Sequence, residues 1–265
     1  MFNADDLIWI DFEVFGGALD LKAAGAFRYV AEASTHTIVL SYAIGNAPAL
    51  TWHADGVILD WNCAPNELRA AYERRKTFAA WNASFDAAVW NYATLGFPFL
   101  APERVIDPMV QAGVSNLPTD LEHASRYLGG PGKQKDGKAL IRMFSIEGAN
   151  PRECPAEWKR FLAYARQDVE AMRDVYRKTR PLPHEEWPPI LGVRAYQPEG
   201  RSDRYALRAQ RRNACDRRCH RHRPPADRAH RRGCHPSYAG ETDRDLDARH
   251  ARRRGNARGP DRRRS

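Results

Sequence analysis

The sequence has no apolar run that approaches the roughly 18 residues that a membrane-spanning helix requires. Cysteine is scarce as well: there are five in 265 residues, an odd number, and Cys63 and Cys154 stand far apart. This usage excludes a dense disulfide framework and favours a reducing compartment. The N-terminus carries Asp5 and Asp6 where a signal peptide would have basic residues. We therefore expect a cytoplasmic protein without a membrane partner.

Lysine, methionine and phenylalanine are all absent from residues 188–265, and the last valine is Val193. The same stretch carries 22 Arg against 9 Asp and Glu, a net charge of +13, which leaves −4 for residues 1–187 out of the chain's +9. A segment with so few apolar residues cannot bury enough surface to offset the entropy of ordering. We expect one globular domain over 1–187 and a disordered, Arg-rich tail over 188–265.

Residues 1–187 show the patterns of both strands and helices. Runs of β-branched and aromatic residues, broken by Gly, Asn and Pro, predict strands over 7–13, 36–44, 49–53, 77–81 and 105–107. The spacing of apolar residues predicts helices over 66–75, 84–95, 108–114, 119–128, 136–143 and 155–178. Strands come first, helices come last, and the two alternate between, which indicates an α/β sandwich.

Two carboxylates lie on the first predicted strand, in the segment LIWIDFEVFGG (7–17). Side chains alternate across a strand, so Asp11 and Glu13 emerge on one face, whereas Phe12 points to the other and suits core packing. Two close carboxylates repel each other, and a divalent cation between them relieves the repulsion. The pattern is compatible with a metal site; the alternative is an exposed strand end with two solvated acids.

Two further segments combine polar residues at helical spacing. In WNASFDAAVWN (81–91), Asn82 and Asp86 stand four apart where a strand passes into a helix. The alternative is that Asn82 and Ser84 supply capping groups for this helix and Asp86 favours its N-terminus. In YARQDVEAMRDVY (164–176), Tyr164 and Asp168 share one helix face, and the alternative is an amphipathic helix with a solvated Asp168. Each pattern is weak when taken singly.

The order of the three patterns is more specific than any one of them. D-x-E on a first strand, N-x-x-x-D at a strand-to-helix junction and Y-x-x-x-D on a late helix resemble the three motifs of the DEDDy 3′–5′ exonucleases, members of the ribonuclease H-like superfamily. The histidine branch of this superfamily has its base five residues before the last Asp, where this chain has Ala163, so the tyrosine branch applies. Longer segments resemble the proofreading domain of phage-type family A DNA polymerases: DFEVFGGALDLKAAGAFRYV (11–30), LSYAIG (40–45), LGGPGKQKDGKALIRMFS (128–145) and PLPHEEW (181–187).

The resemblance implies a ribonuclease H-like three-layer sandwich, with a mixed five-stranded sheet flanked by helices. It also implies that Asp11, Glu13, Asp86 and Asp168 hold two Mg²⁺ or Mn²⁺ ions, which prefer oxygen ligands. Asp11 would bridge both ions, Glu13 and Asp168 would complete one, and Asp86 would support the other through water. Two ions about 4 Å apart can stabilise the attacking and leaving oxygens of a displacement at phosphorus. Tyr164 would orient the attacking water, because a phenol with a pKa of about 10 is a poor base at neutral pH.

The expected partner is single-stranded DNA or a frayed 3′ end. Because residues 1–187 are mildly acidic, we expect few phosphate contacts, with the metal ions supplying positive charge. Asn82 would contact the terminal nucleotide or brace its loop. Lys133 and Lys135, followed by Lys138 and Arg142, form the one local basic cluster. This cluster either contacts the substrate backbone or is a solvated face.

Two residues near the motifs are expected to be structural. Asp107 in VIDPM matches a recurring Asp of the family, but Pro108 follows it, so we predict a helix cap rather than a metal ligand. Phe85 is expected to pack in the core rather than to stack on a base.

Three interpretations of the tail are open. Its Cys and His residues have a spacing that fits no zinc module, and an arginine-rich arm that binds nucleic acid is physically possible. The composition also matches GC-rich DNA read in a wrong frame. The codons of residues 191–204, read one base later, permit W-V-F-E-R-I-N-Q-R-G-V-P-I-D, which resembles the start of the polymerase part of the same enzymes. We expect a frameshift near residue 188 that removed the polymerase domain from this chain.

A 3′–5′ exonuclease that acts on DNA, a proofreading module detached from its polymerase, is the function that the resemblance implies first. An RNA-trimming 3′–5′ exonuclease is the alternative of similar chemistry, because RNA-processing relatives share the tyrosine branch. A non-catalytic nucleic-acid binder that acts through the Arg-rich tail is the alternative of another class, and it would need none of the acidic residues.

Overall fold

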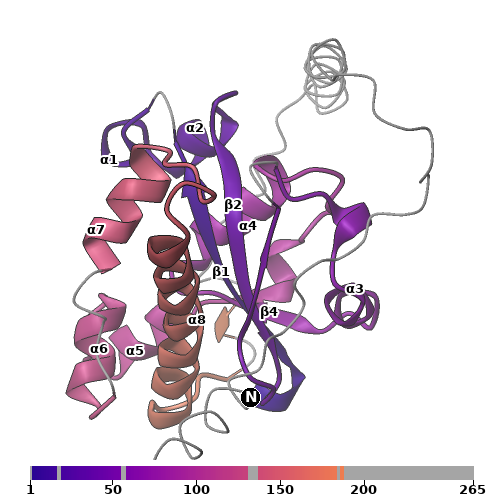
Figure 1. The fold of residues 1–265 in the computed structure, drawn as a ribbon. Coiled ribbons are helices and arrows are strands. Elements are labelled where there is room, and N and C mark those ends of the chain that lie inside the picture. The colour runs from indigo at the N-terminus through magenta and orange to yellow at the C-terminus, as the bar shows by residue number, and fades with distance from the viewer. Residues whose placement is uncertain (1, 17–18, 55–57, 131–136, 184–185, 188–265) are drawn as a thin grey trace, which may run out of the picture. The chain divides into compact units, whose positions relative to one another are not determined.

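The computed structural model describes residues 2–16, 19–54, 58–130, 137–183 and 186–187. They form a five-stranded sheet in the order β3-β2-β1-β4-β5 (Figure 1). The strands are β1 (Leu7–Phe15), β2 (His36–Ile44), β3 (Leu50–His53), β4 (Thr77–Ala79) and β5 (Val105–Ile106). β2 is antiparallel to both β1 and β3, whereas β4 is parallel to both β1 and β5. The predicted α/β fold with a mixed five-stranded sheet is confirmed.

Helices cover both faces of this sheet. They are α1 (Leu21–Ala24), α2 (Ala26–Ala31), α3 (Asn66–Glu73), α4 (Ala83–Tyr92), α5 (Pro108–Val114), α6 (Leu121–Tyr127), α7 (Gly137–Ile141) and α8 (Pro155–Lys178), and a π-helical turn, Arg142–Ile146, follows α7. Short 3₁₀ turns lie at Ala4–Asp6, Trp61–Cys63 and Pro102–Arg104. α8 runs along one face of the sheet, and α4 lies behind the other (Figure 1). The helix–sheet–helix layering agrees with the predicted sandwich.

β1 is buried on both faces, which explains why it begins as an unbroken apolar run. On the α8 side, the rings of Trp9 and Tyr176 meet edge to face with centroids 5.2 Å apart. On the α4 side, Phe12 is 5% exposed and belongs to the largest core cluster, as predicted. Because the faces alternate along the strand, Asp11 and Glu13 emerge on the same face as Trp9, toward α8.

α4 holds the opposite layer in place through Trp90, whose side chain is fully buried. The Trp90 ring meets the rings of Phe78 and Phe97 edge to face, with centroids 4.9 and 4.8 Å away. Phe85, nearer the start of the helix, packs against the same core, which confirms the prediction that it is a core residue. This packing fixes the distance between α4 and the sheet, and with it the position of the first turn of α4.

The long helix predicted over 155–178 matches α8 at both ends, and Pro155 occupies its first turn, where proline is tolerated. Arg173, in the second half of α8, is 5% exposed. Its Nη1 donates to the carbonyl oxygens of Gly45, at 3.0 Å, and Ala47, at 2.6 Å. These bonds tie α8 to the turn that follows β2, so the helix lies in a fixed register against the sheet.

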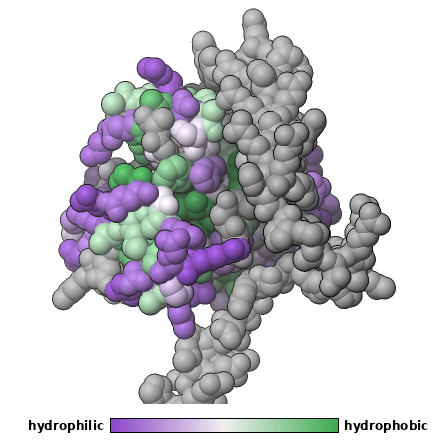
Figure 2. Space-filling model, turned by 45° about the horizontal axis from the view of Figure 1, so that its top comes forward, coloured by the Kyte–Doolittle hydropathy of each residue, from purple (hydrophilic) through white to green (hydrophobic). Residues whose placement is uncertain are grey.

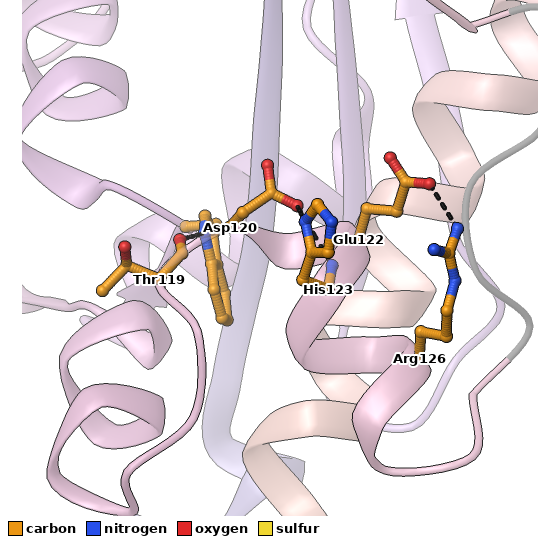
Figure 3. A network of polar contacts seen from close by, with 6 residues as sticks. Thr119, Asp120, Glu122, His123 and Arg126 are labelled. Carbon is orange, nitrogen blue, oxygen red and sulfur yellow. Dashed lines mark hydrogen bonds and ion pairs between the residues drawn. The ribbon is translucent and has the colours of Figure 1, made fainter.

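The structure differs from the predicted elements in a few places. The segment 21–31 forms α1 and α2, which its apolar spacing does not predict; Asp20 caps α1 by accepting the amide of Ala23 at 2.8 Å. β4 ends at Ala79, two residues before the predicted end of the strand at 81. The helix predicted from 119 begins two residues later, because Asp120 caps it by accepting the amide of His123 at 3.0 Å (Figure 3).

No helix within the described ranges is long and apolar enough to cross a membrane. The predicted tail, 188–265, lies outside the described residues, and so do Lys133 and Lys135 of the predicted basic cluster. Their predicted roles therefore stay predictions.

Candidate active site

The acidic end of β1 extends beyond its parallel neighbour. β4 pairs with β1 only as far as Trp9, which lies opposite Ala79, whereas β1 continues beside β2 to Phe15. Asp11 is half-buried in this extension, and Glu13 is 9% exposed. In the described part of the chain, the edge of β1 that faces β4 has no paired strand at these two acids. In Figure 2 the molecule is turned so that the end with α2 and α7 comes forward. This view shows hydrophobic surface in the middle, with hydrophilic side chains around it.

Asp86 of α4 occupies the edge that β4 leaves. Its carboxylate is 3% exposed, and Oδ1 accepts the backbone N–H of Phe12 at 3.0 Å. Phe12 stands between Asp11 and Glu13, so the hydrogen bond places the third acid of the predicted set against the strand that carries the first two. A buried backbone N–H needs an acceptor, and here a side chain provides what a neighbouring strand would provide elsewhere.

Burial raises the pKa of Asp86 well above its ordinary value, and the negative charge of Asp11 is the next largest cause. The amide of Phe12 acts in the opposite direction, because it donates to the charged carboxylate, and the charge of Asp107 raises the pKa further. Asp86 and Asp11 therefore lie close enough to interact electrostatically in a region with little water. Such a pair of acids is stabilised by a positive charge placed nearby.

Tyr164 and Asp168 reach the same region from α8. The Tyr164 side chain is 2% exposed, and burial raises the pKa of its hydroxyl above the ordinary value. The charges of Asp168, Glu13 and Asp11 raise it further, in that order of charge effects, and Tyr164 hydrogen-bonds to the Asp168 side chain. The hydroxyl consequently stays protonated at neutral pH, and it can donate a hydrogen bond but cannot act as a base.

A glycine lets α7 approach the Tyr164 ring. A Cβ atom on Gly137 would lie 2.7 Å from Cε2 of Tyr164 and 3.0 Å from Cδ2, closer than carbon atoms pack. On another side of the ring, Phe161 stacks on Tyr164 with centroids 6.4 Å apart. The ring is therefore enclosed between α7 and its own helix, and its hydroxyl points along a direction set by this packing.

The structure thus brings together the five predicted catalytic residues, Asp11, Glu13, Asp86, Tyr164 and Asp168, from three segments that are far apart in the sequence. Three elements contribute: β1, the first turn of α4 and the middle of α8. Each of the three sequence patterns contributes only part of this group of side chains, which is why each is weak alone and their order along the chain is informative. The roles predicted for the five residues remain predictions.

The donor chemistry of this cluster fits a hard divalent cation. Its ligands would be carboxylate oxygens, the type that Mg²⁺ and Mn²⁺ prefer, and the raised pKa of Asp86 shows that added positive charge would stabilise its ionised form. Within the described residues, no three His, Cys, Asp or Glu side chains are placed to hold one ion as they stand. The acidic side chains would have to turn toward a bound cation.

Of the predicted substrate contacts, the structure describes Asn82, directly before α4, whereas Lys133 and Lys135 lie outside the described residues. Asn82 is exposed and adopts the left-handed conformation, with φ 61° and ψ 51°. Its side chain does not cap α4, so the alternative interpretation of Asn82 as a capping residue is wrong. Lys138 and Arg142 are exposed on α7 and the turn that follows, and Arg142 pairs with Glu147 at 2.8 Å.

Asp107 caps α5, as predicted: its Oδ1 accepts the amide of Met109 at 3.0 Å. Asp107 also has a second role, which the sequence does not predict. Oδ1 also accepts the amide of Asn82 at 3.1 Å, and Oδ2 accepts that of Ala83 at 3.0 Å. Burial raises the pKa of Asp107 to about 6, although the three amides act against the increase. The partners stand 24 and 25 residues away in sequence, so no local signal could have shown this contact.

Comparisons with known proteins find little. No protein-family model matches the chain, and no curated protein matches it. Two solved structures of NrnC from Brucella melitensis, one of them with bound Mg²⁺, are similar to it at 16% sequence identity and a TM-score of 0.35. The likeness covers 65% of this chain and 84% of those chains.

Proposed function

We propose that residues 1–187 form a metal-dependent 3′–5′ exonuclease that releases nucleotides from the 3′ end of single-stranded DNA. The observation that supports this proposal is the meeting of Asp11, Glu13, Asp86 and Asp168 beside the buried hydroxyl of Tyr164. In this proposal the domain is the proofreading module of a DNA polymerase whose polymerase part is absent from this chain.

Two bound Mg²⁺ or Mn²⁺ ions would supply the stabilisation of negative charge on the attacking and leaving oxygens. Asp11, Glu13, Asp86 and Asp168 would hold these ions. The hydrogen bond from the Phe12 amide keeps Oδ1 of Asp86 oriented.

Tyr164 would orient the attacking water through its hydroxyl. Because burial and three neighbouring acids raise its pKa, the phenol keeps its proton and does not remove one from the water. The packing of the ring against Gly137 and Phe161 fixes the hydroxyl, and fixed donors lose little freedom when the substrate binds.

The purified full chain should shorten a 5′-labelled single-stranded DNA into a ladder and release single nucleotides from a 3′-labelled strand, in both cases only with Mg²⁺ or Mn²⁺. Asp168→Asn should lower the rate by several orders of magnitude, because it removes a ligand charge. Asp174→Asn is the matched control on the same helix: Asp174 pairs with Lys178 at 2.8 Å on the surface, and the rate should change by less than about twofold. Equal rates for the wild type and Asp168→Asn would refute the proposal.

Matched RNA and DNA strands of one sequence distinguish the two exonuclease candidates, because shortening of RNA alone would replace the DNA assignment with RNA trimming. The Arg-rich composition of 188–265 supports a different candidate, a non-catalytic binder. That candidate predicts that deletion of 188–265 abolishes binding to nucleic acid while Asp11→Ala preserves it. The exonuclease proposal predicts loss of cleavage in Asp11→Ala and its persistence after the deletion.

A further inference from the structure

One buried carboxylate joins the starts of two helices. Asp107 is 4% exposed, and its two oxygens accept three backbone amides: Met109 in α5, and Asn82 and Ala83 at the start of α4. A charged acceptor forms stronger hydrogen bonds to amides than a neutral one does. The carboxylate therefore links the β5–α5 junction to the β4–α4 junction across the end of the sheet.

α4 depends on this link because it has no cap of its own. The residue before it, Asn82, has a positive φ of 61° and makes no side-chain capping bond. The left-handed conformation is uncommon for residues other than glycine, and surrounding contacts have to hold it. The first amides of a helix also need acceptors, and Asp107 provides one for Ala83 and for the turn residue before it.

We propose that Asp107 is a positioning residue that sets the orientation of Asp86. Ala83 and Asp86 stand within one turn of α4, so a shift of the helix start moves the Asp86 carboxylate away from the Phe12 amide, which lies 3.0 Å from it. Asp107 need not touch the substrate or a metal ion for this role. The catalytic consequence rests on the proposed nuclease function, whereas the link between Asp107 and the Phe12 amide does not.

Asp107→Ser separates the two caps. Serine is as good an N-cap as aspartate, so the α5 cap to Met109 can persist, but its single short hydroxyl cannot also serve Asn82 and Ala83. Asp120→Ser is the matched control, because Asp120 also caps a helix, accepting the amide of His123 at 3.0 Å (Figure 3). Asp120 lies on the exposed start of α6. The residue before it, Thr119, accepts the indole N–H of Trp81 through its backbone carbonyl at 2.9 Å, and the substitution of Asp120 leaves that carbonyl in place.

Amide hydrogen exchange of the full chain gives a readout that a general loss of stability does not imitate. Asp107→Ser should speed exchange of the Asn82, Ala83 and Phe12 amides by roughly tenfold or more, because each loses a buried hydrogen bond to a carboxylate. Asp120→Ser should leave these three amides unchanged and speed exchange only at His123. With a nucleic-acid substrate, Asp107→Ser should lower kcat by a similar factor with KM unchanged, since only the position of a reacting-site acid is altered.

Faster exchange at Asn82 and Ala83 with an unchanged Phe12 amide would overturn the proposal, because Asp107 would then cap α4 without positioning Asp86. An equal effect of Asp120→Ser at Phe12 would overturn it too. If Asp107→Ser does not fold, amide exchange of the wild type tests the link. The amides of Ala83 and Phe12 should then show the same protection, because one local opening exposes both. Different protection of these two amides would refute the link. A wild type without nuclease activity would refute the proposed function while the exchange result still tests this link.

Discussion

Gly137→Ala tests whether the packing of α7 on Tyr164 positions the reacting hydroxyl. The added Cβ would lie 2.7 Å from Cε2 and 3.0 Å from Cδ2 of the ring. The ring cannot retreat freely, because it is 2% exposed and stacks on Phe161. Either α7 or the ring has to move, and overpacking of this kind costs about 1–3 kcal/mol of stability.

Gly113→Ala is the matched control, since Gly113 also lies in a helix, α5, and a Cβ there would meet nothing within 4 Å. Replacing a helical glycine by alanine stabilises a protein by about 0.5–1 kcal/mol when the space is open. The same gain applies to Gly137→Ala apart from the clash. The difference in unfolding free energy between the two variants therefore isolates the contact with Tyr164, about 1–3 kcal/mol.

Urea denaturation measures the two stabilities, and single-turnover cleavage of a 5′-labelled strand measures the consequence for the site. A displacement of about 1 Å of a positioning group can lower a rate by roughly 100-fold. We expect Gly137→Ala to lose stability and most of its activity, and Gly113→Ala to gain stability and keep its activity. A Gly137→Ala variant that is as stable as Gly113→Ala and cleaves at the wild-type rate would show that this contact does not position Tyr164.

Three further predictions concern stability. Burial raises the pKa of Asp107 to about 6, whereas in the unfolded chain the carboxyl releases its proton near pH 4. The free energy of unfolding of the wild type, relative to that of Asp107→Asn, should therefore fall by up to about 3 kcal/mol as the pH rises from 4 to 6. Urea titrations at several pH values check this, and a difference that grows in favour of the wild type contradicts it. Arg173→Met should lower the free energy of unfolding by on the order of 3 kcal/mol, because the carbonyls of Gly45 and Ala47 lose a charged donor. Chemical denaturation measures this loss, and a change below about 1 kcal/mol would contradict a structural role for Arg173. Trp90→Ala should cost about 3–5 kcal/mol in the same assay, because it empties the centre of the α4 core, and a small loss would mean that neighbouring rings refill the space.

Much of the fold could be predicted because the relevant signals are local. The apolar run before Asp11 predicts a strand buried on both faces, and the apolar spacing from 155 to 178 predicts α8 at its full length. The predicted catalytic residues could be proposed from the order of their motifs, although no local signal shows that β1, α4 and α8 meet. The helices α1 and α2 are not predicted, because helices of four and six residues have too few periodic positions to give a pattern.

The remaining errors concern contacts between distant residues. Asn is common as a helix cap, so capping was the alternative to a substrate contact for Asn82. Asn82 instead adopts the left-handed conformation, and Asp107 accepts the amide of Ala83. The end of β4 was placed two residues late, because Trp81 suits a strand as well as a turn. Gly137 was not singled out at all. Its importance comes from the ring of Tyr164, which the chain brings beside it only in the folded structure.

The early end of β4 connects the fold to the chemistry of the site. Where β4 stops, the Phe12 amide of β1 loses a strand partner, and Asp86 accepts its hydrogen. A neutral acceptor would also have satisfied the Phe12 amide, and it would not have met the charge of Asp11. The raised pKa of Asp86 means that its ionised form opposes folding, so the carboxylate reduces stability at neutral pH. Groups that reduce stability in this way are typical of functional sites. The arrangement therefore favours the binding of a metal ion, whose positive charge would offset the negative charge of the acids.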